Sequence, residues 1–287
     1  ALDTLFQFYN YSSDIGFGKD IFGRVADGLY GRLSGPFQDL VPGCYLSRFF
    51  FINLLYVYVI INRVSVKYKV FLIFGLSLNM SMIFFSGERM AFATLCLGLI
   101  LCIMFSKKIR NLLIFAIIIS VIFIIVNLKI HPHFSNFKIL ESTAKHEGLI
   151  ITRDIDCDKG ECTKKIFRQQ PRFVDVMKNF NKSAYGEIYS TSYNIWKDNI
   201  LLGIGLNNFT TVCKNNSKYK KYHEEFGCTT HPHNLYLQAL VESGVIGFVL
   251  FSTFVLLFFY KINSLALLEI KIIIWSVLLT IFWPIMS

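Results

Sequence analysis

The chain has 287 residues, of which 54% are hydrophobic and 17% charged, and its formal net charge is +10. Soluble domains are roughly 45–50% apolar, and here the apolar residues form long blocks, which argues against a soluble domain. In a membrane protein, basic loops that set the orientation account for such a charge, so we expect the lipid bilayer and not a nucleic acid as partner.

Six apolar blocks approach the length of about 20 residues that a helix needs to cross a bilayer. Helices are expected because lipid offers no partners for backbone polar groups. The sequence therefore predicts an all-α polytopic membrane protein with about six visible transmembrane helices and one large external helical loop. The expected spans are residues 46–61, 70–86, 90–105, 111–128, 243–260 and 265–283.

These spans divide the chain into three parts. Residues 1–128 hold an external segment and four transmembrane helices, residues 129–234 form the large loop, and residues 235–287 hold two more transmembrane helices. The sequence begins without Met and stops just as a span ends, so we expect a fragment that lacks helices at both ends.

The short loops at 62–69, 106–111 and 260–271 are basic, and they fall on one side if the spans alternate. An excess of Lys and Arg in short loops marks the cytoplasmic side. The amino-terminal segment, the turn at 86–89 and the large loop are then external or periplasmic.

Arginines stand at the external ends of the first spans. Arg89, in FFSGERMAFATL, is a candidate diphosphate ligand because a guanidinium matches two phosphate oxygens at once. The alternative is an interface arginine whose stem lies along lipid. Arg24 and Arg32 lie in a segment that Gly, Pro and Asp make a structured loop, whereas Arg48 suits an interface anchor.

The large loop contains a helical pattern in YSTSYNIWKDN, where Tyr189, Tyr193 and Trp196 share one face. This face either packs on the membrane domain or its interface, or stacks on a sugar. The glycines of LLGIGLNNF, residues 201–209, suit a helix end and turn and do not match a phosphate-binding loop.

Cysteines in the large loop indicate disulfides, because the loop is placed in an oxidising compartment. Cys213 with Cys228 would pin the segment leading to His231, and Cys157 with Cys162 would close a tight loop. Free thiols and a metal site are the alternatives, although the spacings match no standard zinc pattern. The histidines available to such a metal site are His223, His231 and His233.

The stretch HPHNLYLQALVESGVIGF, residues 231–248, places two histidines and an asparagine at the head of a span. An imidazole titrates near neutrality, so His233 is the first candidate for a general base and His231 the second. Asn234 would orient the base. The alternative is a histidine that hydrogen bonds hold in a structural role.

This stretch resembles the signature of the O-antigen ligase and O-antigen polymerase superfamily, in which a glycine follows a histidine by eleven positions. Here the pair is His233 and Gly244, and FFSGERMAFATL looks like the family's Ser-Gly-x-Arg turn, with Arg89 in the arginine place. RLSGPFQD and WKDNILLGIGLNNF resemble two further family segments. YGEIYSTSYNIW lacks an arginine that members often carry, for which Arg172 or Arg32 is the candidate replacement.

The resemblance implies a metal-independent glycosyltransferase without a cofactor, in a bacterial inner membrane, with its active site facing the periplasm. The donor would be a glycan on undecaprenyl diphosphate, and the acceptor a hydroxyl of the lipid A core, of a glycan or of a protein. The overall likeness favours the ligase, which uses the lipid A core. His233 would be the base and Arg89 the diphosphate ligand, with Arg32 or Arg24, Asn234 and His231 in the substrate site.

A transporter or channel is the alternative from another class, and a non-catalytic envelope scaffold is a third. Intramembrane charges would mark a transport pathway. The expected spans carry almost no charge at mid-depth, and polar groups gather at the outer rim, which favours surface chemistry.

Reporter fusions test this topology. A fusion at residue 66 should report a cytoplasmic location and one at residue 180 an external location, because the short loops with excess Lys and Arg stay inside. The reverse pattern would overturn the topology and the chemistry inferred from it.

Overall fold

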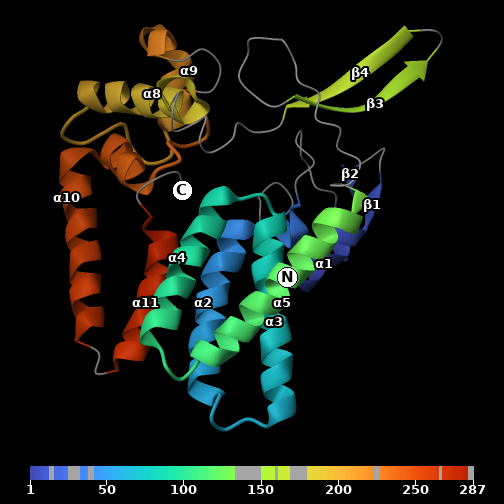
Figure 1. Cartoon of the computed structure of the whole chain (residues 1–287). Helices are drawn as coiled ribbons and strands as arrows, with labels where there is room; N and C mark the ends of the chain where they lie inside the picture. Colours follow the sequence, from blue (N-terminus) through green and yellow to red (C-terminus); the bar gives the residue numbers. More distant parts are fainter. Residues whose placement is uncertain are drawn as a thin grey trace. The chain divides into compact units, whose positions relative to one another are not determined.

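The structure is a computed structural model that describes residues 1–12, 16–24, 33–37, 42–132, 150–158, 161–168, 180–222, 227–264 and 267–283. The chain divides into two compact units, whose elements are labelled in Figure 1. Unit 1 comprises Ala1–Arg172 and Leu268–Thr280, and unit 2 comprises Phe173–Leu267 and Ile281–Ser287.

Unit 1 is mainly helical. Its helices are α1 (Leu2–Tyr9), η1 (Gly35–Phe37, a 3₁₀ turn), α2 (Gly43–Ile60), α3 (Val66–Phe85), α4 (Arg89–Phe105), α5 (Arg110–Ile130) and α11 (Leu268–Ile281). Two small antiparallel sheets pair β1 (Tyr11–Ser12) with β2 (Gly16–Phe17), and β3 (Ile150–Asp158) with β4 (Glu161–Arg168).

The all-α polytopic architecture is confirmed, with a difference in the lengths of the spans. Among the described residues, α2, α3, α5 and α10 (Leu235–Asn263) are long and apolar enough to cross a membrane. The expected spans at 90–105 and 265–283 correspond to shorter helices, α4 with 17 residues and α11 with 14. The β3–β4 hairpin was not expected in a helical loop; its β-branched Ile and Thr residues favour strands.

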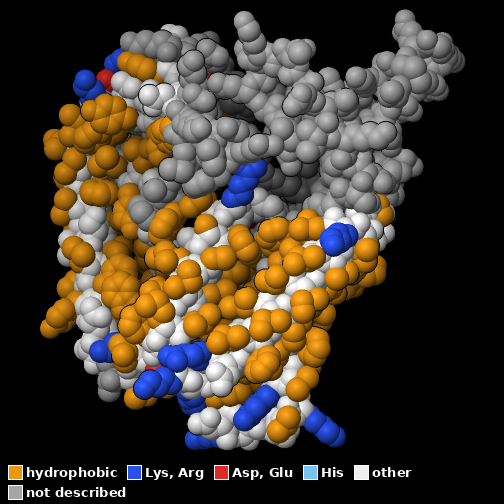
Figure 2. All heavy atoms as spheres, in the orientation of Figure 1, with side chains coloured by type: hydrophobic (Ala, Val, Ile, Leu, Met, Phe, Trp, Pro, Cys, Tyr) orange, Lys and Arg blue, Asp and Glu red, His pale blue; other side chains and the backbone are white. Residues whose placement is uncertain are grey.

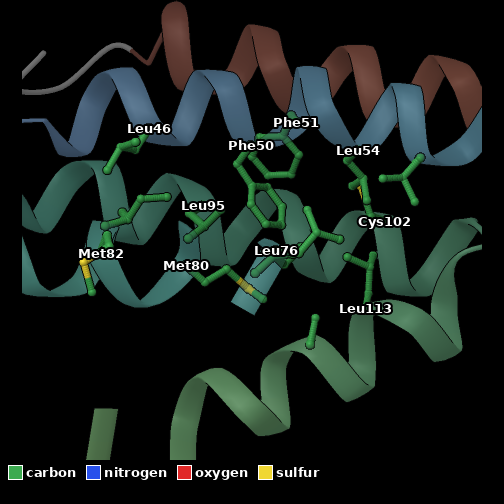
Figure 3. Close-up of a cluster of buried hydrophobic side chains, with 14 of the residues drawn as sticks. Leu46, Phe50, Phe51, Leu54, Leu76, Met80, Met82, Leu95, Cys102 and Leu113 are labelled. Carbon is green, nitrogen blue, oxygen red and sulfur yellow. The ribbon is translucent and has the colours of Figure 1, made fainter. Parts of the chain in front are cut away.

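The core of unit 1 lies where α2, α3, α4 and α5 pack together (Figure 3). Phe50, Phe51 and Leu54 of α2 are fully buried there. A Cβ at Gly98 of α4 would overlap the ring of Phe51, so this glycine permits the close approach of α2 and α4.

Serines join α3 to α5 within this apolar setting. The Ser77 hydroxyl donates to the Ala116 carbonyl at 2.8 Å, and the hydroxyls of Ser81 and Ser120 are 2.9 Å apart. Such hydrogen bonds are a common means of joining helices in lipid, where packing gains no hydrophobic driving force.

Two contacts bring the basic loops of unit 1 to one end. The Lys108 ammonium lies 4.1 Å from the ring of Tyr58 near the end of α2, and the Lys107 amide donates to Glu269 of α11 at 2.9 Å. On the face shown in Figure 2, hydrophobic side chains cover these helices, and Lys and Arg side chains gather at their lower end. The end of α2, the loop at 106–111 and the start of α11 thus lie together at one end of unit 1, and the side of the membrane stays a prediction.

The amino-terminal segment packs at the opposite end of unit 1, which we call the outer end. The ring of Phe8 stacks on Phe85 at the end of α3, with centroids 4.5 Å apart, and on His131 after α5, at 4.0 Å. The Tyr9 hydroxyl donates to Asn127 of α5 at 2.8 Å. The segment is thus a structured element across the ends of the helices.

Unit 2 contains η2 (Phe180–Lys182), α8 (Ala184–Asp198), α9 (Phe209–Asn215), η3 (Ser217–Tyr222) and α10. Ser183 caps α8 by accepting from the Gly186 amide at 3.1 Å. The core of the unit is Ile195, Phe209, Cys213, Tyr219 and Val241. The helix expected around Tyr193 is confirmed; Trp196 packs against this core, whereas Tyr193 is 53% exposed.

Candidate functional site

Two histidine rings lie against each other directly before α10. The ring centroids of His231 and His233 are 4.2 Å apart, and both residues are half-buried. His233 has φ 51°, in the left-handed region that non-glycine residues seldom adopt, although histidine does so more often than most. Backbone strain of this kind gathers at functional sites. With Pro232 buried between them, the sequence His-Pro-His brings two imidazoles to one place.

Asn234 fixes the start of the helix that follows the histidines. Its side-chain oxygen accepts from the amides of Tyr236 and Leu237, each at 3.0 Å, which is the geometry of a helix N-cap. Its amide group donates to the Tyr189 hydroxyl of α8 at 3.3 Å. Asn234 therefore fixes the backbone directly after His233 and joins it to α8.

Helix α8 supplies an aromatic wall that the sequence analysis recognised only in part. The ring of Tyr185 meets His233 edge-on, with centroids 6.2 Å apart. Tyr185 and Tyr189 are four residues apart, which places them on one helix face. That spacing was the available signal for Tyr185, which was not predicted as a site residue.

The two histidines have different surroundings. Burial lowers the pKa of His231, and the nearby carboxylate of Glu242 opposes this in part. Glu242 is itself buried and accepts from Gln238 at 3.3 Å. Two imidazoles with centroids 4.2 Å apart resist double protonation, because like charges at this distance repel.

A disulfide and a hydrogen bond fasten the segment before the histidines to α9. Cys213 and Cys228 are bonded, as predicted, with Cα atoms 5.6 Å apart. The Thr210 hydroxyl donates to the Thr229 carbonyl at 2.8 Å. The disulfide removes both sulfurs as metal ligands, and the described part of the chain holds no group of three His, Cys, Asp or Glu suited to a metal.

The second predicted disulfide remains a prediction. In the β3–β4 hairpin, the backbone of Cys157 is paired opposite that of Cys162. His223 and Arg172 lie outside the described residues.

Helix α10 breaks at Gly244, which has φ 65° and ψ −168°. The break is the physical counterpart of the glycine in the histidine motif: a short helix precedes it and a long apolar helix follows it. Such a break leaves backbone carbonyls and amides without their helical partners.

The loop between α8 and α9 provides those partners. The amides of Ile204 and Gly205 donate to the carbonyls of Val241 and Glu242 at 3.0 and 2.9 Å. The carbonyls of Ile200 and Leu201 accept from the amides of Val245 and Ile246 at 2.9 and 3.3 Å. The stretch WKDNILLGIGLNNF and the histidine segment thus form one assembly, which was not predicted.

The arginine candidates at the outer end of unit 1 have distinct partners. Arg89 is exposed and is the first residue of α4. The carboxylate of Glu88 accepts from the Cys44 amide at the start of α2, which ties the Ser-Gly-Glu-Arg turn to that helix. Glu88 therefore positions the turn, in addition to any effect on the charge of its neighbour.

Arg48 lies one turn further along α2 than Cys44. Its Nε is buried without a hydrogen-bond partner in the described residues, and its guanidinium lies 6.0 Å from the ring of Tyr45. A buried cationic donor of this kind favours an anionic ligand. Sequence reasoning did not favour Arg48, because an arginine at the head of a span is ordinarily an interface anchor.

Arg24 is exposed, and its Nη1 donates to the Pro36 carbonyl at 2.6 Å, so it closes the amino-terminal segment upon itself. Arg32 lies outside the described residues. The structure places Arg24, Arg48 and Arg89 in unit 1, and His231, His233 and Asn234 in unit 2.

Residues 72–252, which include Arg89, His233 and Gly244, match a family model described as O-antigen ligase. No curated protein and no solved structure matches the chain.

Two glycines of the loop between α8 and α9 allow a test of how tightly this loop packs on α10. Gly203 and Gly205 both have positive φ, but a Cβ at Gly203 would lie 2.5 Å from the Val241 carbonyl, whereas one at Gly205 would meet only the end of the Asn208 side chain. Gly203→Ala should cost a few kcal/mol of stability and Gly205→Ala about 1 kcal/mol. Thermal unfolding in detergent measures both, and equal losses would mean that the contact with α10 is not tight.

Proposed function

The chain belongs to the O-antigen ligase family, and from this premise we propose that it transfers a glycan from undecaprenyl diphosphate to an acceptor hydroxyl. Membership makes it a multi-pass membrane glycosyltransferase of the ligase or polymerase type. The observation that carries the proposal for the site is the His231–His233 pair, held in a strained turn before a membrane helix.

The position of the histidines suits a lipid-linked donor. The polyprenyl tail lies in the bilayer and the diphosphate at its surface, so the bond to be broken lies at the membrane edge. Gly244 begins the long apolar part of α10, and the histidines precede it. We propose that this edge faces the periplasm of a bacterial inner membrane.

In the proposed reaction, the acceptor oxygen attacks the anomeric carbon of the donor sugar. A bond forms between this oxygen and the carbon, the bond from the carbon to the diphosphate oxygen breaks, and the diphosphate leaves with the electron pair. The proton of the acceptor hydroxyl passes to His233. General-base help of this kind typically contributes about 10²–10⁴-fold.

The leaving diphosphate gains negative charge, which arginines at a water-poor surface stabilise. Arg89 is the first candidate because it is exposed at the outer end, on a turn that Glu88 ties to α2. Arg48, whose buried Nε has no hydrogen-bond partner among the residues that the structure describes, is a second candidate, and Arg24 and Arg32 are further ones. The proposal needs no metal ion, because these guanidinium groups supply the positive charge.

We propose the lipid A core as acceptor, with a growing glycan or a protein hydroxyl as the other members of the same class. A transporter is less well supported. In α3, α4 and α5 every Lys and Arg lies in the first or last turn, so the middle of these helices carries no charge, whereas charges within the membrane mark a transport pathway.

The base assignment is tested by comparing the two histidines. His233→Ala should lower the rate of transfer about 10²–10⁴-fold, because no other group takes the proton as well. His231→Ala should lower the rate of transfer less.

The assay offers undecaprenyl-diphosphate repeat units and lipid A core together to the full protein in lipid. Glycan on lipid A core indicates a ligase, and a ladder on the carrier indicates a polymerase. Near-full activity of His233→Ala would refute the assignment.

The diphosphate ligand is tested at Arg89. Arg89→Ala should reduce transfer by about 10²–10³-fold, the usual loss when one donor to a developing anion is removed. Arg89→Lys should recover only part, since an ammonium does not bind two oxygens as a guanidinium does. The matched control is Arg63→Ala, an exposed arginine in the loop after α2, which should leave the rate unchanged. Equal effects at both positions would argue against a specific role.

A further inference from the structure

The loop between α8 and α9 exposes a dense group of large apolar side chains. We call residues 200–206 the leucine loop. The exposed fractions are 48% for Ile200, 66% for Leu201, 73% for Leu202 and 78% for Leu206. Polar residues bound the loop, with Asn199 before it and Asn207 after it. Contiguous exposed apolar surface of this kind marks an interaction site.

The depth of this loop follows from the length of the membrane helix that it braces. Beyond the break, α10 runs from Val245 to Asn263. At 1.5 Å per residue this part is about 28 Å long, close to the roughly 30 Å of the hydrocarbon core. The whole of it is needed to cross the bilayer, so Val245 and Ile246 lie at the boundary of the hydrocarbon.

Backbone hydrogen bonds place the leucine loop at the same level. The Val245 amide donates to Ile200 at 2.9 Å, and the Ile246 amide donates to Leu201 at 3.3 Å. The apolar surface continues along α10, where Ile246, Val249 and Leu250 are at least 50% exposed. The loop therefore extends the lipid-facing surface of the span sideways at its end.

Several backbone amides of the leucine loop are hydrogen-bonded, as an apolar environment requires. The Gly203 amide donates to Asn199 at 2.9 Å, and the amides of Ile204 and Gly205 donate to α10. Unpaired backbone groups are costly in lipid, and this pairing removes much of that cost.

We propose that the leucine loop inserts into the bilayer leaflet on the side of His233, with Leu201, Leu202 and Leu206 among the acyl chains of the membrane lipids. The loop then fixes the level of unit 2 at the membrane surface. Continuity with the span selects bilayer lipid as the occupant over a second copy of the chain.

Photocrosslinking of the full chain tests the insertion without any assay of glycosyl transfer, so its outcome is independent of the proposed function. Benzoylphenylalanine replaces Leu202 or Leu206 in separate variants, reconstituted in vesicles of phosphatidylethanolamine and phosphatidylglycerol. Leu250 on α10 is the positive control, and Asn215, an exposed polar residue of α9, is the negative control. Retention of the Cys213–Cys228 disulfide verifies that each variant is folded.

Mass spectrometry after illumination should find lipid adducts at positions 202 and 206 at a level comparable with position 250 and at least tenfold above position 215. Adducts at 250 alone would overturn the proposal. Crosslinks at 202 and 206 to a second copy of the chain in place of lipid would also overturn it, and would identify an interface between protomers. Two positions are used so that, if one variant fails to fold, the other variant still tests the insertion.

Discussion

The structure of unit 2 depends on how the broken backbone of α10 is paired. At Gly244 the helix turns out of its regular course, and four hydrogen bonds with residues 200–205 replace those that the helix loses. In a membrane, unpaired backbone amides and carbonyls have no water as an alternative partner. The break in α10 therefore requires the hydrogen bonds that the loop provides. Gly203 and Gly244 let two backbones meet where a Cβ on either would collide with the other segment. The direction of the histidine-bearing helix relative to the span is thereby fixed.

The same bracing gives the histidine pair a rigid setting. Asn234 caps the short helix, the disulfide and Thr210 hold the preceding segment, and Tyr185 covers one ring. A left-handed histidine persists only where its surroundings over-determine it. Burial lowers the pKa of His231, and one proton is easier to place on two neighbouring rings than two.

The sequence predicted those features that local physics determines. Apolar blocks predicted the helices because lipid forces backbone pairing within a segment, and the expected oxidising compartment of the large loop predicted the Cys213–Cys228 bond. The β3–β4 hairpin was missed because its β-branched residues lie within a polar loop that was read as helical. The packing of Gly203 against Gly244 could not be predicted from the sequence, because backbone pairing between distant segments leaves no periodic pattern of residue types. The burial of the Arg48 Nε could not be predicted from the sequence, because it depends on tertiary packing.

The Cys213–Cys228 bond also sets an order of events in the life of the protein. A disulfide of this kind forms in an oxidising compartment and not in a reducing cytosol. In the proposed orientation, the segment that carries the histidines would gain this covalent tether only after its export. In a newly made chain still in the cytosol, the segment would lack the disulfide. The site would then mature when the segment reaches the oxidising compartment. In that orientation, export and assembly of the histidine pair would be a single step of biogenesis.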